Sequence, residues 1–173
     1  MKQRGITLIE VMVTLLIIGI GLLGLLGLQA KSLSGHKDSF DRKTAAELIV
    51  QISERMRSNH LGFMSDAYAS SMGVGVPVSA PPSCGGTTNC TVTESAQLDI
   101  ASWQANVRSR LADSGTFIVT RPGPGSTMLT NGTSVRVTIA WRDGQPATFA
   151  DTACADVGIT QATYRCIAAE VFP

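Results

Sequence analysis

The sequence predicts an α+β fold in which one long N-terminal helix packs on a small antiparallel β-sheet. An apolar run from Ile6 to Leu28 continues, without a strong breaker, into a stretch with helical periodicity. Beyond it, short segments alternate apolar and polar residues, which is typical of half-buried strands. A chain of 173 residues has room for a single domain of ordinary size, so helix and sheet are expected to share one core.

The apolar run has the length of a membrane-spanning helix. It contains one charged residue, Glu10, and would extend for about 35 Å as a helix, enough for a bilayer core. A secretory signal peptide would have a shorter apolar core followed by a small-residue cleavage site, and neither is present here. Lys2 and Arg4 precede the helix, which favours an N-terminus in the cytoplasm and a domain outside it.

Glu10 separates this segment from a plain membrane anchor. A carboxylate in the apolar part of a membrane helix costs a few kcal/mol, so it usually has a partner and a purpose. The residues before it are short and basic and end in Gly5, and residues 4–10 read RGITLIE. This segment resembles the type III leader of prepilins, although the family usually has phenylalanine where this chain has Ile6.

The resemblance implies how the N-terminus is processed and used. A prepilin peptidase would cleave after Gly5 and methylate the new N-terminus at Ile6. Glu10 would neutralise the terminal amine of a neighbouring subunit, because opposite charges are tolerable in an apolar filament core only as a pair. Three parts of the chain follow: a cleaved leader at residues 1–5, a membrane and filament-core half-helix at 6–30, and a periplasmic pilin domain at 31–173.

The second half of the long helix and the helix after it carry further resemblances. An apolar stripe from Ala45 to Met56 has helical spacing, and the helix is expected to stop at Asn59–Gly62. A second helix is expected near 98–111, with Asp99 as its N-cap and Gly115 as its stop. Three segments resemble PilV-type minor pilins. They are the ERMRSN sequence at 54–59, the glycine-rich run 19–27, and the aspartate, tryptophan, valine and leucine that recur every four residues from Asp99. In filaments of this family that run often unwinds, so bending or unwinding is expected there.

The rest of the domain is expected to consist of a long loop and a sheet of three or four antiparallel strands. The loop from Gly62 to Cys90 is rich in glycine, serine and proline. By the resemblance, it occupies the place where pilins make subunit-specific contacts. Strands are expected at 117–120, 135–141 and 163–171, with a hairpin turn at Asn131-Gly132. Together with the long helix they make the type IV pilin fold that the resemblance implies.

The four cysteines lie in the part that would be exported, where an even number favours disulfide bonds. Short loops favour pairing Cys84 with Cys90 and Cys154 with Cys166, although four cysteines allow three connectivities. A zinc site is the competing interpretation. The spacings lack the close cysteine pair of most zinc sites, so no metal is expected.

Composition and motifs argue against enzymes and nucleic-acid binders. The net charge of +1 provides no strong field to attract nucleic acid, and the arginines are not interleaved with aromatic residues. The histidines, His36 and His60, fall in the helical region and are expected on the surface. Motifs for phosphate, dinucleotide or catalytic zinc are absent from the sequence. We therefore expect a non-enzymatic protein without cofactors and without a nucleic-acid partner.

Three functional hypotheses remain. The leading one is a minor pilin that joins other minor pilins and the major pilin, first in the inner membrane with its domain in the periplasm and later in the pilus at the cell surface. Its effect would be to prime assembly, and so to support adhesion and twitching motility. A minor pseudopilin of a type II secretion system shares the leader, helix and priming logic. A membrane-anchored adhesin or ligand-binding module is the third hypothesis, suggested by the long Gly62–Cys90 loop.

Mass spectrometry of filaments sheared from the cell surface tests the processing. We expect the N-terminal peptide of this subunit to begin at a methylated Ile6, because the leader resemblance places cleavage after Gly5. An N-terminal peptide that still contains residues 1–5, or that begins elsewhere, would contradict the leader assignment. The subunits that co-purify in the same sample identify the assembly system.

Overall fold

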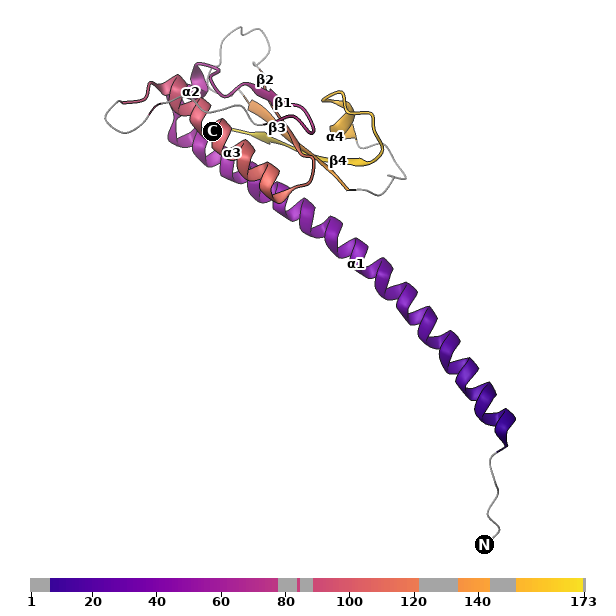
Figure 1. The fold of residues 1–173 in the computed structure, drawn as a ribbon. Helices are drawn as coiled ribbons and strands as arrows, with labels where there is room; N and C mark the ends of the chain where they lie inside the picture. The colour runs from indigo at the N-terminus through magenta and orange to yellow at the C-terminus, as the bar shows by residue number, and fades with distance from the viewer. Residues whose placement is uncertain (1–6, 78–83, 85–88, 122–133, 144–151, 173) are drawn as a thin grey trace. The chain divides into compact units, whose positions relative to one another are not determined.

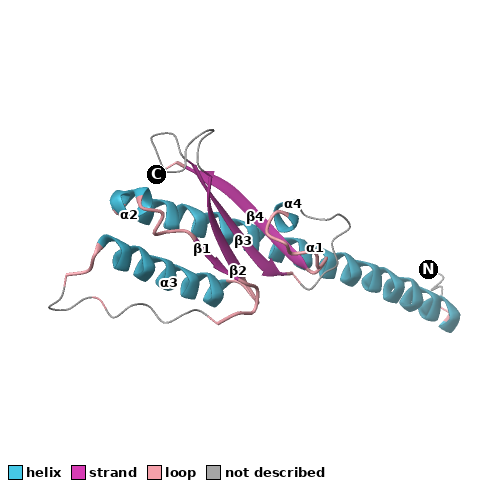
Figure 2. Cartoon of the chain, turned by 90° about the horizontal axis from the view of Figure 1, so that it is seen from above, coloured by secondary structure: helices cyan, strands magenta, loops and turns pink. Residues whose placement is uncertain are grey.

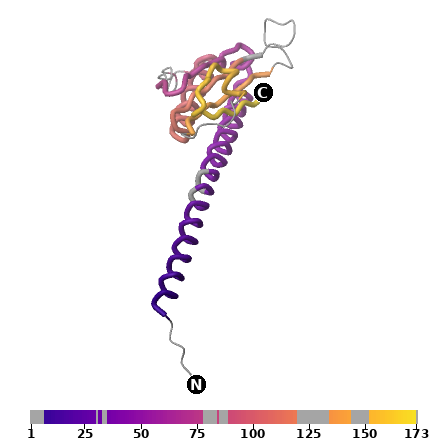
Figure 3. The backbone as a smooth tube through the Cα atoms, turned by 90° about the vertical axis from the view of Figure 1, so that its right-hand side faces the viewer, coloured from indigo at the N-terminus to yellow at the C-terminus, as the bar shows by residue number. Residues whose placement is uncertain are grey.

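The structure is a computed structural model that describes residues 7–77, 84, 89–121, 134–143 and 152–172. Its elements, in chain order, are α1 (Leu8–Ser58), α2 (His60–Met64), β1 (Ser70–Met72), α3 (Val92–Arg110), β2 (Gly115–Arg121), β3 (Ser134–Arg142), α4 (Thr152–Ala155) and β4 (Tyr164–Val171) (Figure 1). The chain forms two compact units, residues 1–40 and 41–173. The single continuous helix α1 contributes to both, as the chain trace in Figure 3 shows.

The four strands form one antiparallel sheet with the order β1-β2-β3-β4, so the α+β prediction is confirmed. β2, β3 and β4 lie where alternation predicted strands, within one or two residues at each end. In β3 the residues Val135, Val137, Ile139 and Trp141 are completely buried and share one face of the sheet. The expected hairpin turn at residues 131 and 132 lies outside the described residues.

The main core forms where two helices meet this face of the sheet. α3 runs beside the C-terminal part of α1 in both Figure 1 and Figure 2. The predicted stripe of α1 is buried, with Ala45, Leu48, Ile49, Ile52 and Met56 at most 5% exposed. Trp103 of α3 is also fully buried and donates its indole N–H to the carbonyl oxygen of Leu48 at 2.8 Å. Deep burial of this ring is possible because its one polar atom has a partner.

The opposite face of the sheet is covered at one end by α4. The disulfide between Cys154 and Cys166 joins this short helix to β4. Cys154, Cys166, Ala140 and Tyr164 form a second, smaller buried cluster. A four-residue helix cannot be stable alone, so the covalent bond and this cluster hold it in place.

Three sequence-based boundaries were wrong. α3 begins at Val92 rather than near Leu98, and its N-cap is Thr91, not Asp99. Asp99 instead lies inside the helix and uses its carboxylate for a tertiary contact. Gly115 does not stop the helix, which ends at Arg110, but opens β2. A side chain there would come within 2.9 Å of the Met72 carbonyl oxygen, so glycine permits the close approach of β1.

Two boundaries in the segment after α1 also differ in detail. α1 ends at Ser58, and α2 follows after Asn59, so the expected stop is a change of helix direction rather than a loop. The region 62–90 was expected to be irregular, but it contains the end of α2 and the strand β1. Pairing with β2, rather than any local preference, explains how Ser70–Met72 becomes a strand.

The cap of α3 predicts a pH-dependent stability. The Thr91 backbone N–H, and then its hydroxyl, hydrogen bond to the Glu94 carboxylate and hold its pKa below the ordinary 4.5. A lowered folded-state pKa means stabilisation that is complete above about pH 4.5 and is lost as the pH falls through the folded-state value. We expect Glu94→Gln to remove this acid-dependent component, measured by thermal unfolding between pH 3 and 7, a range chosen to bracket that pKa. Identical pH profiles of variant and wild type would contradict this role.

Candidate functional site

The apolar half of α1 is the first candidate for a functional surface. Leu8–Gln29 is long and apolar enough to cross a membrane. Every large apolar side chain from Leu8 to Leu28 is exposed, from 47% for Val11 to 77% for Leu8. An apolar surface of this extent is not stable in water and marks a site for lipid or protein. The segment therefore needs either a bilayer or a bundle of neighbouring helices.

Glu10 lies in the first turn of α1 within this apolar surface. Its side chain is exposed, and within the described part of the chain no cation pairs with it. Its backbone N–H donates to the Thr7 carbonyl oxygen at 3.1 Å. A helix N-terminus favours a carboxylate, but this does not compensate for burial in an apolar environment. Gly5 and Ile6 lie outside the described residues, so cleavage and methylation remain predictions.

The glycines at positions 19, 21, 24 and 27 lie in the same half of α1. The helix runs through them without interruption in the isolated chain. A methyl group built at any of them would meet nothing within 4 Å. Their presence is therefore not explained by contacts within this chain, whereas small residues let neighbouring membrane helices approach closely. The expected unwinding concerns the assembled filament and remains a prediction.

The second candidate region joins the end of α1 to α3 through Arg55, Tyr68 and Asp99, which we call the α1–α3 clasp. The Arg55 guanidinium lies 3.3 Å from the Asp99 carboxylate and donates to the Ser102 hydroxyl at 2.5 Å. Both charged side chains are about one-third exposed or less, at 31% and 27%. A pair shielded to this degree is stronger than one on the open surface.

Tyr68 completes the clasp from the chain that follows α2. It is 1% exposed, and its hydroxyl donates to the Asp99 carboxylate at 2.7 Å. Burial, and then the hydrogen bond to Asp99, raise the pKa of Tyr68 above its ordinary value. The phenol therefore stays protonated and remains a donor across the physiological pH range. Asp99 thus accepts from two different segments at once.

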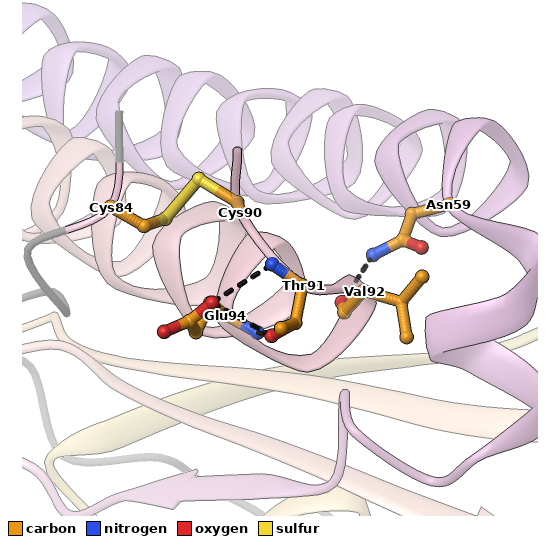
Figure 4. The surroundings of a disulfide bond; sticks show 6 residues. All are labelled: Asn59, Cys84, Cys90, Thr91, Val92 and Glu94. Atoms are coloured by element: carbon orange, nitrogen blue, oxygen red, sulfur yellow. Dashed lines mark hydrogen bonds between the residues drawn. A yellow bond between two sulfur atoms is a disulfide. The ribbon is translucent and has the colours of Figure 1, made fainter. Parts of the chain in front are cut away.

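Asn59 adds a second link between the end of α1 and the start of α3. Its side-chain amide donates to the Val92 carbonyl oxygen at 2.9 Å (Figure 4). The amide oxygen accepts from the Gly62 N–H at 3.1 Å. A side chain at position 62 would collide with this amide at 2.5 Å, which explains the glycine. Arg57, by contrast, pairs with Glu54 on the exposed surface. Within residues 54–59, then, Arg55 and Asn59 face α3.

Both disulfide bonds lie in the domain. Cys84 is joined to Cys90, with 5.3 Å between their Cα atoms, immediately before the Thr91 cap of α3 (Figure 4). Cys154 is joined to Cys166, with 5.2 Å between Cα atoms. No free cysteine remains among the four. His36 and His60 are exposed, as expected from the sequence.

Two known families match the N-terminal part of the chain. Residues 1–26 match the family described as the prokaryotic N-terminal methylation motif. Residues 27–101 match the family described as type IV pilin Tt1218. Neither a curated protein nor a solved structure matches the chain.

A methylation motif, an exposed apolar helix and a helix-backed antiparallel sheet fit a membrane-anchored pilin subunit. The two matches are consistent with a type IV pilin-like protein, and the type IV pilin family is structural rather than enzymatic. The matches indicate a component of a pilus or pseudopilus, and the leader motif implies processing by a prepilin peptidase and assembly with other pilins. The chain is held in the inner membrane before assembly.

The clasp generates a stability prediction with an internal control. Asp99→Ala leaves the Arg55 guanidinium and the Tyr68 hydroxyl without their shared acceptor, so we expect the free energy of unfolding to fall by about 2–3 kcal/mol. Glu54→Ala breaks the neighbouring exposed pair with Arg57 and should cost less than about 0.5 kcal/mol. Denaturant unfolding of the full-length chain in detergent, followed by the fluorescence of the two buried tryptophans, measures both. Equal effects of the two substitutions would show that the clasp is not a stabilising contact.

Proposed function

We propose that this chain is a minor pilin that joins other minor pilins in a priming complex at the pilus tip and so promotes type IV pilus assembly. Adhesion and twitching motility would depend on it indirectly, through the number of pili. The mechanism is non-enzymatic. It consists of helix packing, a charge pair between Glu10 and a neighbouring subunit, and contacts between domains.

The observation that carries the minor-pilin assignment is the clasp between two segments that resemble PilV-type minor pilins. Residues 54–59 and residues 99–111 are far apart in the sequence, yet Arg55 of the first and Asp99 of the second are in contact at 3.3 Å. Trp103, Val107 and Leu111 of the second segment all lie in the core. The resemblance is thus supported by a physical unit, a helix pair, rather than by two unrelated short matches.

The assembly mechanism rests on the exposure of the N-terminal helix. Transfer of its apolar side chains from lipid to a bundle of helices requires that no charge is left alone in that bundle. Glu10 satisfies this condition only if a cation faces it, and the described part of this chain supplies none. The amino group of a neighbouring subunit, created by cleavage after Gly5, has the required charge. Assembly and charge neutralisation are then the same event.

A minor pseudopilin of a type II secretion system is the alternative, because it would use the same leader, apolar helix and glutamate. Deletion of the gene discriminates between the two. We expect fewer surface pili and unchanged release of secreted enzymes. Normal piliation with a defect in secretion would overturn the pilus assignment and establish the pseudopilus.

Substitution of Glu10 tests the charge pair. In Glu10→Ala we expect the amount of this subunit in sheared filaments to fall at least about tenfold, since an unpaired buried charge costs more than 1.4 kcal/mol. The membrane-bound precursor should remain at its normal level. Glu47→Ala, which removes an exposed carboxylate from the other half of α1, is the matched control and should be incorporated normally. Unchanged incorporation of Glu10→Ala would exclude the charge-pair mechanism.

A further inference from the structure

A groove of about 340 Å³ follows the free edge of β1. One wall consists of five consecutive residues, 69–73, so the groove meets the strand along its edge rather than on one face. The facing wall is a single stripe of α3 with helical spacing, formed by Gln97, Ile100, Ala101 and Gln104. Ala67, Val76 and Pro77 complete the lining.

Among the described residues, β1 is an edge strand with one side unpaired. It pairs with β2 through Ser70, Ser71 and Met72 and is the last strand in the order β1-β2-β3-β4. In an antiparallel ladder, alternate residues direct their backbone N–H and C=O groups away from the paired neighbour. Among the described residues no other segment pairs with that side of β1. The groove therefore presents unused backbone donors and acceptors, the template for strand addition.

The walls of the groove are held in place without a partner. Gln104 donates its side-chain amide to the Thr116 hydroxyl at 3.0 Å and lies 3.3 Å from the Ser70 hydroxyl, which links α3 to both β2 and β1. The Arg108 guanidinium donates to the Val76 carbonyl oxygen and fixes the segment after β1 against α3. A site with preformed walls loses less conformational entropy when it binds.

We propose that an extended, uncharged segment of a neighbouring pilin subunit binds in this groove and adds to β1 as a fifth strand. The partner is identified by the lining, which contains no charged side chain, and by the free backbone groups of β1. Strand addition takes its affinity from main-chain hydrogen bonds and its selectivity from pockets for alternate side chains. Small side chains such as Ala69 and Ala101 leave the space for those of the incoming segment.

The surface beside β1 is hollowed at a second place. This second hollow, of about 380 Å³, is lined by Ala69, Ser70, Ser71, Ile118 and Val119, and shares three residues with the first. Residues 69–71 therefore border both hollows. This proposal rests on the proposed function, since it names the contact that the domain makes in the filament.

Hydrogen exchange and a matched pair of substitutions test the groove. The exchange of the amides at 69–73 is compared between filaments and the full-length chain in detergent, and we expect it to slow at least about tenfold on assembly. Gln97→Trp fills the groove from its exposed rim. Ala105→Trp makes the same addition at an exposed position of α3 outside the groove. We expect Gln97→Trp to lower incorporation into filaments at least about tenfold and Ala105→Trp to change it less than about twofold.

The outcomes separate this inference from the proposed function. Two results would contradict strand addition in the groove and leave the minor-pilin proposal standing. They are wild-type filaments without protection at 69–73, and equal incorporation of both tryptophan variants. Slow exchange already present in the free chain would also overturn it, because the edge would then be covered by the chain itself. A neutral oligosaccharide such as maltoheptaose could instead bind the wild-type chain and not Gln97→Trp, with no protection at 69–73 in filaments. That result would overturn strand addition and identify a glycan as the ligand of the groove. Absence of the wild-type chain from filaments would overturn the proposed function and the groove together.

Discussion

The domain depends on one constraint, the burial of the apolar stripe of α1 between Ala45 and Met56. A helix cannot bury its own stripe, so α3 and the sheet must cover it. Trp103 meets this need with a large ring and a hydrogen bond to the Leu48 carbonyl oxygen. Arg55 and Asp99 then fix the two helices at the far end of the stripe. Removal of α3 would expose the stripe, and the sheet would lose the surface on which it packs.

In its first half, the same helix exposes its apolar side chains instead of burying them in the domain. From Leu8 to Leu28 its apolar side chains are exposed, and none of the residues that the structure describes covers the glycines among them. This half is therefore built for contacts with other molecules, first lipid and then neighbouring helices. The change from one requirement to the other occurs within a single continuous helix. Membrane insertion, filament packing and domain folding thus all depend on one element.

Sequence patterns predicted the parts of the fold that have strong periodicity. The stripe of α1 and the alternation in β3 are long enough to be unambiguous. The cap of α3 is also marked in the sequence, since Thr91 and Glu94 have the spacing of a capping box, whereas the apolar pattern that begins at Leu98 pointed to Asp99. β1 and the role of Tyr68 were not readable, because three residues show no period and a clasp depends on tertiary contacts. Glu10 was found because a lone carboxylate in an apolar run is conspicuous.

The central claim is that the exposed half of α1 is covered by other subunits and that Glu10 is neutralised there. Electron cryomicroscopy of filaments that contain this subunit tests it directly. We expect Leu8–Gln29 to lie within a bundle of neighbouring helices, with the Glu10 carboxylate within about 4 Å of the amino group of an adjacent subunit. A subunit whose helix is absent from that bundle, or whose Glu10 faces only apolar side chains, would contradict the account.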